Sequence, residues 1–262
     1  MSGGATPDKT IPRVALVTGA AHRIGRAIVL DLAEQGFDVA IHYNRSGDAA
    51  EKLAAHIRGM GRRAVTVAAD LGSEDDTASL TDRAAQALGP IGVLVNNASR
   101  FEYDVWDSVT RESWDTHMGA NLRAPFLLSQ GMARALPEDA EGVIVNLLDQ
   151  RVWNLTPYFI SYTLSKAGLW TLTQTLALAL APRIRVNAIG PGPTIKSERQ
   201  DENHFRMQWD ATPLQHGASP EEIAAGIRYI LAARSMTGQM IALDGGEHLG
   251  WAQPSRGLIP FE

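Results

Sequence analysis

Short apolar runs alternate with longer stretches of helical periodicity along almost the whole chain of 262 residues. Each run is bounded by turn-forming residues and does not alternate cleanly between apolar and polar residues. That pattern is typical of strands buried on both faces of a parallel sheet. The seven runs are residues 14–18, 39–42, 64–68, 93–96, 143–148, 184–189 and 240–243. This order predicts an α/β fold with a doubly wound parallel sheet of about seven strands.

Apolar residues between the runs recur at helical spacing, which predicts helices packed on the sheet. One stripe consists of Ile24, Ala27, Ile28 and Leu32, and a second of Leu53, Ile57 and Met60. The chain has no internal repeat and no linker-like segment. We therefore expect residues 1–262 to form a single domain.

Two segments break this rhythm. The helix predicted over residues 161–181 is apolar nearly all round, so it requires burial on more than one side. A subunit interface and a deep core position both satisfy that requirement. Residues 190–219 are polar and rich in Pro and Gly. A loop of that length in a compact domain is usually a lid or a binding loop, so we expect the substrate loop there.

The charge and cysteine content exclude several classes of protein. The formal net charge of −5 argues against a nucleic acid or an anionic membrane as partner, because neither gains from an acidic surface. The absence of Cys excludes disulfides and thiolate metal sites. The seven His are scattered without ligand spacing, so no metal site is expected. The N-terminus lacks the apolar core of a secretory signal, and we expect a cytoplasmic protein.

A glycine-rich turn follows the first predicted strand and leads into the first predicted helix. It reads Thr18-Gly19-Ala20-Ala21-His22-Arg23-Ile24-Gly25. Glycines permit a tight turn and close approach of a pyrophosphate, and the helix N-terminus offers free N–H groups to it. At this position the turn predicts a Rossmann-like dinucleotide site that includes Thr18, Gly19, Arg23, Ile24 and Gly25.

The end of the second predicted strand carries no acid, although an acid there would bind both ribose hydroxyls of NAD. It reads His42-Tyr43-Asn44-Arg45-Ser46. Arg45, Ser46 and Arg23 together would form a cationic niche for a 2′-phosphate, which predicts NADP(H) as the cofactor. Alternatively, Arg45 simply begins a solvated helix.

Two further strand ends predict cofactor contacts. Asp70 and Leu71 follow the third strand, where the Asp70 carboxylate would accept a hydrogen bond from adenine. Asp70 might equally cap the helix that starts near Ser73. After the fourth strand, the small and amide residues Asn97, Ala98 and Ser99 would let a cofactor lie close.

Tyr162 and Lys166 are four residues apart on a predicted helix and share one face of it. A Tyr hydroxyl has an ordinary pKa of about 10, too high for easy proton exchange at neutral pH. A nearby ammonium group would favour the phenolate and lower that pKa. The pair therefore predicts a proton donor and acceptor at Tyr162.

These motifs resemble the short-chain dehydrogenase/reductase family from about Val14 to Gly246. The resemblance rests on the glycine turn, Asn96-Asn97-Ala98, Asn121, Tyr162-x-x-x-Lys166, Pro191-Gly192 and Asp244-Gly245-Gly246. It implies that Tyr162 is the catalytic acid/base and also contacts the cofactor, and that Lys166 holds the nicotinamide ribose. It also implies that Asn121 supports a proton-relay water, that Pro191 and Gly192 contact the cofactor, and that the protein is a homotetramer.

One departure from the family pattern concerns the substrate. Asp149 stands where the family usually has a Ser that polarises a carbonyl, and a carboxylate cannot donate to a carbonyl oxygen unless protonated. An acid there suits a nitrogen heterocycle. The pteridine reductases, and the dihydromonapterin reductases close to them, are similar in this respect, in Arg23 and in residues 42–46. They are also similar in residues 97–101, where Ser99 and Phe101 would line a pterin site. The resemblance implies that the substrate contacts Arg23, Ser99, Phe101, Asp149 and Tyr162. Phe101 may alternatively be ordinary loop packing, and Asp149 a structural acid.

Three functions remain open at this point. The first is NADPH-dependent reduction of a pterin or dihydropterin, with hydride transfer and Tyr162 as proton donor. The second is reduction of a ketone or 3-oxoacyl compound by the same machinery. The third is a non-catalytic NADP(H)-binding protein, against which the intact Tyr162, Lys166 and Asn121 speak.

Overall fold

Seven parallel strands form one sheet in the computed structural model, which describes residues 10–196 and 201–250. The strands are β1 Val14–Val17, β2 Asp38–Tyr43, β3 Ala64–Ala68, β4 Val93–Asn96, β5 Gly142–Leu147, β6 Ile184–Pro191 and β7 Met240–Leu243. Their order across the sheet is β3-β2-β1-β4-β5-β6-β7. The α/β fold with a Rossmann-like, doubly wound sheet is thus confirmed, and strand bounds differ from the prediction by a residue or two.

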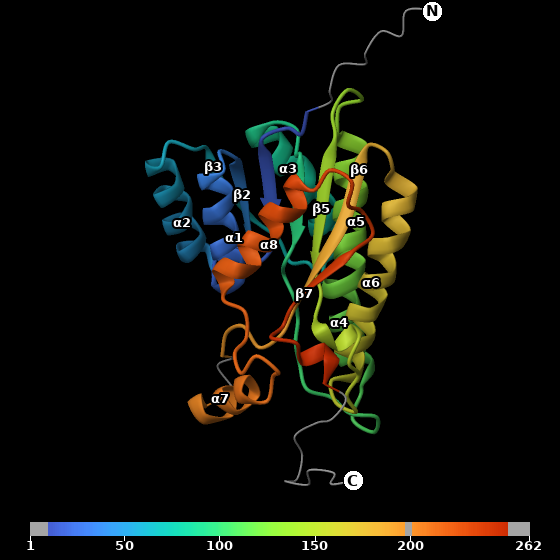
Figure 1. Cartoon of the computed structure of the whole chain (residues 1–262). Coiled ribbons are helices and arrows are strands. Elements are labelled where there is room, and N and C mark those ends of the chain that lie inside the picture. The colour runs from blue at the N-terminus through green and yellow to red at the C-terminus, as the bar shows by residue number, and fades with distance from the viewer. Residues whose placement is uncertain (1–9, 197–200, 251–262) are drawn as a thin grey trace, which may run out of the picture.

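Helices cover both faces of the sheet (Figure 1). The helices α1 Arg23–Glu34, α2 Gly47–Gly59 and α8 Pro220–Ala232 pack on one face, where α1 and α8 lie side by side. The other face is covered by α3 Glu74–Leu88, α5 Ala124–Ala135 and α6 Ile160–Leu180. Two separate apolar cores result, one on each side of strands that are buried on both faces.

The predicted apolar stripes are confirmed except at one end. Ile28, Leu32, Leu53 and Ile57 are buried in the core beneath α1 and α2. Met60 is not part of that stripe, because α2 ends at Gly59 and the Met60 side chain is 38% exposed. The helix ends there because Gly61 adopts a positive φ of 82°, and the chain continues into β3.

The change of strand order places a crevice beside β1. From β1 the chain proceeds outward through β2 to β3, then crosses back to β4 on the other side of β1. The loops after β1 and β4 therefore diverge at the carboxyl edge of the sheet. In doubly wound sheets, ligands bind at this switch point.

Helix α6 buries one face against the sheet and leaves apolar residues on the other. Leu169 and Leu176 are buried, whereas Leu164 and Leu178 are 45% and 83% exposed. The deep-core position considered above therefore does not describe the whole helix. The exposed apolar face is compatible with a subunit interface.

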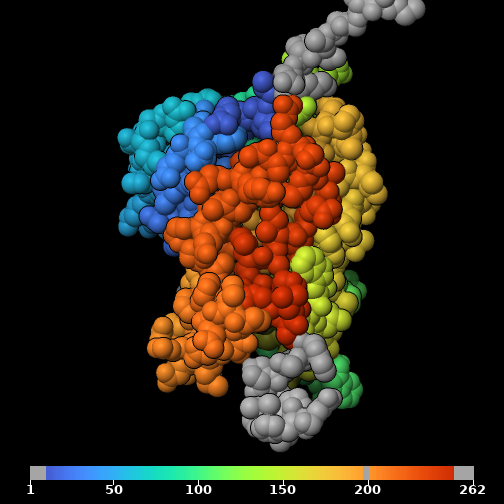
Figure 2. All heavy atoms as spheres, viewed as in Figure 1, coloured from blue at the N-terminus to red at the C-terminus, as the bar shows by residue number. Residues whose placement is uncertain are grey.

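The prediction of a loop over residues 190–219 is only partly correct. Strand β6 continues to Pro191, and helix α7 Glu202–Asp210 lies within the segment. Phe205 and Trp209 are four residues apart, so their rings meet on one face of α7 at 5.0 Å between centroids. The Trp209 Nε1–H donates to the carbonyl of Pro193 at 2.6 Å. Helix α7 stands away from the sheet (Figures 1 and 2).

The remaining elements are short. Helix α4 Arg111–Met118 leads into a π-helical turn, η1 Gly119–Arg123, and two 3₁₀ turns, η2 Gln150–Val152 and η3 Glu247–Leu249, follow β5 and β7. No helix of the described ranges is long and apolar enough to cross a membrane. The tail after Gly250, in which Trp251 lies, is outside the described residues.

Candidate active site

The glycine turn after β1 is shaped by the absence of two side chains. Gly19 adopts a φ of +60°, which a side chain disfavours. A Cβ on Gly25 would lie 2.3 Å from the Gly19 carbonyl oxygen and 2.7 Å from Nδ2 of Asn97. Glycine is therefore required at residue 25 for α1 to approach the turn and β4 so closely.

Hydrogen bonds connect the turn to the end of β4. The Thr18 hydroxyl oxygen accepts from the backbone N–H groups of Asn97 and Ala98, at 2.9 and 3.0 Å. In return, Asn97 Nδ2 donates to the carbonyls of Thr18 and Gly19 at 2.8 and 3.1 Å. These bonds hold the two sides of the crevice together, and they account for Thr18 and Asn97 at these positions.

His42 fixes the turn from the β2 side. The Gly19 N–H donates to its Nδ1 at 3.0 Å, so Nε2 carries the proton and donates to the Ala69 carbonyl at 3.1 Å. Burial lowers the pKa of His42, with the Ala69 hydrogen bond opposing. A neutral His42 thus braces the backbone of the turn.

A pocket of about 300 Å³ opens at the switch point beside this turn. Most of the predicted cofactor residues line it, together with Ala21, His22, Arg100 and Ala120. The predicted ones are Gly19, His42, Tyr43, Asn44, Arg45, Ser46, Asp70, Leu71, Ala98 and Ser99. Residues from the ends of β1, β2, β3 and β4 therefore converge on one cavity, as a nucleotide site in this fold requires.

The first residues of helices α2 and α3 decide between the alternatives stated above for Arg45 and Asp70. Helix α2 begins at Gly47 with Ser46 as its N-cap, so Arg45 precedes the helix and does not begin it. Helix α3 is capped by Ser73, whose hydroxyl accepts from the Asp76 N–H at 3.4 Å. Asp70 instead accepts from the Gly72 N–H within its own loop.

Arg23 stands at the start of α1 with a positive φ of 55°. Its guanidinium donates to the carbonyls of Ile195 and Lys196, each at 2.9 Å. Arg23 is therefore engaged with the segment after β6, and it is not among the residues that line the pocket with Arg45.

The end of β6 lies beside the same edge of the sheet. The Gly192 N–H donates to the Leu243 carbonyl at 3.1 Å. A Cβ on Gly192 would lie 2.8 Å from Cα of Asp244. Pro191 ends the strand, and the compact Gly192 lets the chain pass close to β7 as it leaves the sheet.

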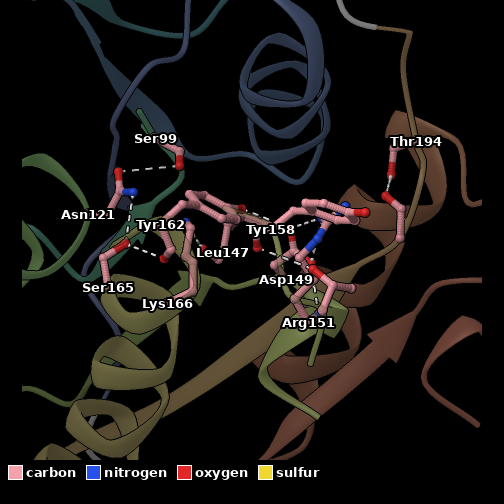
Figure 3. A network of polar contacts seen from close by, with 12 residues as sticks. Ser99, Asn121, Leu147, Asp149, Arg151, Tyr158, Tyr162, Ser165, Lys166 and Thr194 are labelled. Carbon is pink, nitrogen blue, oxygen red and sulfur yellow. Dashed lines mark hydrogen bonds and ion pairs between the residues drawn. The ribbon is translucent and has the colours of Figure 1, made fainter. Parts of the chain in front are cut away.

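Tyr162, Lys166 and Asp149 meet at the start of α6, beside the end of β5 (Figure 3). The Tyr162 hydroxyl donates to Oδ2 of Asp149 at 2.8 Å. Asp149 caps η2 by accepting from the Arg151 N–H, also at 2.8 Å. Lys166 Nζ donates to the Leu147 carbonyl at 2.8 Å and lies 5.8 Å from the centroid of the Tyr162 ring.

The electrostatics of Tyr162 differ from the expectation that Lys166 lowers its pKa. Burial, and then the charge of Asp149, raise the pKa of Tyr162 well above its ordinary value, against the opposing charge of Arg151. Burial also lowers the pKa of Lys166 to about 8, with Asp149 opposing. The carboxylate contacts the phenol directly and the ammonium does not, so the protonated phenol is favoured over the phenolate.

Asn121 lies in the π-helical turn η1, a local irregularity often found at functional sites. Its Oδ1 accepts from the Arg100 N–H at 2.7 Å, and its Nδ2 donates to the Arg100 carbonyl at 2.9 Å. Nδ2 also donates to the Ser165 hydroxyl at 3.0 Å, one turn along α6 from Tyr162. Asn121 therefore clamps the segment after β4 to α6.

An aromatic wall adjoins the Tyr162 hydroxyl. The Phe101 ring stacks on Phe159 at 4.5 Å between centroids and meets the Tyr162 ring edge-on at 4.6 Å. Phe101 is nevertheless 40% exposed, so one part of its ring faces outward. Phe159 has a left-handed backbone, φ +57°, immediately before α6. Such strain in a bulky residue clusters at functional sites.

Ser99 lies between this wall and the cofactor pocket. Its hydroxyl donates to Asn121 Oδ1 at 3.3 Å, and the residue also lines the pocket. The predicted substrate residues Ser99, Phe101, Asp149 and Tyr162 are thus brought together, whereas Arg23 reaches the segment after β6.

A buried polar network adjoins the aromatic wall, and no sequence motif predicts it. The Glu102 N–H donates to His117 Nε2 at 3.0 Å, so His117 Nδ1 carries the proton and donates to the Ser161 hydroxyl at 2.7 Å. Ser161 in turn donates to Asp104, whose backbone carbonyl accepts from the Phe159 N–H. The network ties the segment carrying Phe101 to the start of α6, and it requires a neutral His117.

This requirement predicts a pH-dependent stability. Burial lowers the pKa of His117, against the charges of Asp104 and Glu102, so the unfolded chain takes up a proton at higher pH than the folded one. The contribution of His117 is fully present above its ordinary pKa of 6.5 and is lost as the pH falls below it. We expect the urea midpoint to fall between pH 7.5 and 5.5 more steeply for the natural protein than for His117→Gln. Equal slopes would contradict this role.

Among the described residues, no group of three or more His, Asp or Glu is placed to hold a metal ion.

Comparisons with known proteins place these features in context. The model of the short chain dehydrogenase family matches residues 13–206. The chain is 48% identical to a Brucella canis protein crystallised with NADP and described as FolM alternative dihydrofolate reductase 1. That match covers 95% of this chain and 100% of the other, with a TM-score of 0.89. The corresponding Brucella suis protein, also crystallised with NADP, is 50% identical over 92% of this chain and 97% of its own, with a TM-score of 0.87.

A curated relative carries a different activity in its name. It is the 3-oxoacyl-[acyl-carrier-protein] reductase of Synechocystis sp.. It is 32% identical over 89% of this chain and 96% of its own length.

Proposed function

Because the chain belongs to the short-chain dehydrogenase family, we propose that it is an NADPH-dependent reductase of pterin or dihydropterin substrates. The observation that carries this proposal is the hydrogen bond from Tyr162 to Asp149 beside Phe101. The FolM proteins, similar over nearly the whole chain, support the same substrate class. Its assembly as a homotetramer and a cytoplasmic location stay predictions.

The donor set of the pocket fits NADP(H). Two features of the turn suit the close approach of a pyrophosphate: the positive φ of Gly19, and the close packing of Gly25 that brings the start of α1 against the turn. Arg45 and Ser46 line the pocket at the end of β2, where a 2′-phosphate would lie, and residues 42–46 include no acid. When bound, NADPH supplies the hydride that the reaction transfers to a ring carbon.

Residues of the chain then donate the proton and hold the substrate ring. Tyr162 gives its phenolic proton to the ring nitrogen next to that carbon, so that a C=N bond becomes CH–NH. Lys166, buried beside Tyr162, would bind the nicotinamide ribose. Asp149 would hold the Tyr162 hydroxyl in line and accept from a ring N–H, which a carbonyl substrate does not have. Phe101 would cover one face of the flat ring.

A turnover assay tests this proposal. We expect NADPH oxidation, followed at 340 nm, with at least one of dihydrobiopterin, dihydrofolate and dihydromonapterin. The same enzyme preparation is assayed with a 3-oxoacyl thioester. No turnover with any of the three dihydropterins would contradict the proposed substrate class.

A carbonyl reductase is the second candidate, favoured by the 3-oxoacyl reductase relative. Turnover of the 3-oxoacyl thioester alone would select it. The third candidate, a non-catalytic NADP(H)-binding protein, is disfavoured by the hydrogen-bonded pair Tyr162 and Asp149 at the site, since a protein that only binds does not need a proton donor.

The choice of cofactor gives a separate prediction. Replacing Arg45 by Ala is expected to lower kcat/KM for NADPH at least about tenfold, because a charge-assisted hydrogen bond to the 2′-phosphate is lost. The value for NADH should change little. Arg58→Ala is the matched control, since Arg58 forms an ion pair with Glu51 on α2 and does not line the pocket. A natural preference for NADH would overturn the assignment.

A further inference from the structure

Arg151 is a buried cation in the middle of the candidate substrate site. It lies in the 3₁₀ turn η2, two residues after Asp149. Its side chain is 21% exposed, which is unusual for an arginine away from an interface. No motif in the sequence draws attention to it, and the proposed reaction described above assigns it no part.

The contacts of Arg151 converge on Asp149. Its Nη1 lies 3.3 Å from Oδ1 and 3.1 Å from Oδ2 of the carboxylate, and its backbone N–H donates to Oδ1 at 2.8 Å. Tyr162 donates to Oδ2 from the other side. Asp149 thus receives donors from both neighbours, so that its orientation toward Tyr162 is fixed by Arg151 (Figure 3).

The guanidinium itself is held by aromatic rings. Its Cζ lies 5.7 Å from the centroid of Phe101 and 5.5 Å from that of Phe159, within range of a cation–π interaction. The same two rings form the wall proposed to cover a pterin. Arg151 therefore connects the proton donor to the surface that receives the substrate ring.

The other charged groups around Arg151 come from two elements. Glu247, on η3, interacts with the charge of Arg151. Burial raises the pKa of Glu247 to about 7, and the charge of Arg151 opposes that shift. From α6, Lys166 and the Tyr162 phenol face the Asp149 carboxylate. Asp149 is the only one of these groups that forms a direct ion pair with Arg151 among the described residues.

We propose that Arg151 is a positioning residue for the proton transfer, which holds the acceptor Asp149 in place against Tyr162 and orders the Phe101–Phe159 wall. This inference rests on the proposed function for the identity of the substrate, but not for its test. Without the guanidinium, the Asp149 carboxylate loses the charge that opposes its own, and it no longer accepts from Tyr162 in a fixed geometry.

The test compares Arg151→Ala and Arg151→Lys with the natural enzyme over pH 5–9, using whichever substrate the enzyme reduces. For Arg151→Ala we expect kcat to fall at least about tenfold at neutral pH and the acid limb of the pH profile to move upward by about one unit. Guanidinium chloride at millimolar concentration should restore activity and return that limb. Arg151→Lys should retain an intermediate activity. Sodium chloride at equal ionic strength and Arg58→Ala are the controls.

A readout without turnover separates this inference from the proposed function. Arg151→Ala should lower Tm, and Asp149→Asn in the same chain should recover part of that loss, because an amide does not need the cation. Failure of the substrate assay would overturn the proposed function and leave this coupling intact. A pH profile that falls equally at all pH values, with no guanidinium rescue and additive changes in Tm, would overturn the role of Arg151.

Discussion

Replacing Tyr162 by Phe is expected to reduce dihydropterin turnover by about a thousandfold, within the range usually lost with a general acid. The change removes only the hydroxyl that donates to Asp149, and the ring remains to pack edge-on against Phe101. The barrier rises because the ring nitrogen must then take its proton from solvent in a buried site. The measurement is kcat/KM for the dihydropterin that the natural enzyme reduces.

Binding and folding serve as the controls for this variant. The affinity for NADPH, measured by fluorescence titration, should stay within about threefold, because Tyr162 does not line the pocket at the switch point. Tm should fall little, since Asp149 keeps its bonds to Arg151. Full activity of Tyr162→Phe would remove Tyr162 from the chemistry and favour a protein that only binds its cofactor.

Replacing Asp149 by Ser separates the two substrate classes. For a dihydropterin we expect a loss of about a hundredfold or more, because the ring N–H and the Tyr162 hydroxyl both lose an acceptor. For a 3-oxoacyl substrate the same change should preserve or raise turnover. A serine hydroxyl donates to a carbonyl oxygen, and the carboxylate does not. The measurement is the ratio of the two kcat/KM values in both enzymes.

Asp149→Asn is the matched control for size and shape. The amide can still donate and accept, but it carries no charge to oppose that of Arg151. We therefore expect it to be impaired toward the dihydropterin without becoming a better carbonyl reductase than the serine variant. If Asp149→Ser raised dihydropterin turnover, the assignment of Asp149 to the substrate site would be wrong.

The strands and the glycine turn could be predicted because their signals are local. The run Val143-Ile144-Val145 is apolar and fully buried, as is typical of a strand that lies between two layers of helices. Gly25 and Tyr162-x-x-x-Lys166 follow from spacing alone, since backbone geometry fixes what such residues can reach. Asp149 could be singled out because it stands where the family usually has a Ser, and the structure shows that it accepts a hydrogen bond from Tyr162.

Other features depend on side-chain positions that no local pattern encodes. Arg151 reads as one more arginine in a loop, and its burial against Phe159 appears only once η2 and α6 are packed together. In the sequence, His117 is one of several scattered histidines. Only the structure shows that it hydrogen-bonds to Ser161, which in turn donates to Asp104. The raised pKa of Tyr162 has the same origin, because burial and the Asp149 charge outweigh Lys166 only in three dimensions.

The glycine turn is held by Thr18, Asn97 and His42 through bonds that involve neither Asn44 nor Arg45. Asn44 and Arg45, by contrast, are exposed. The part of the pocket that would grip the pyrophosphate and the part that would discriminate between cofactors are therefore mechanically separate. Replacing Arg45 and Ser46 by an acidic strand end should therefore change the cofactor preference to NADH without changing the residues that carry out the reaction.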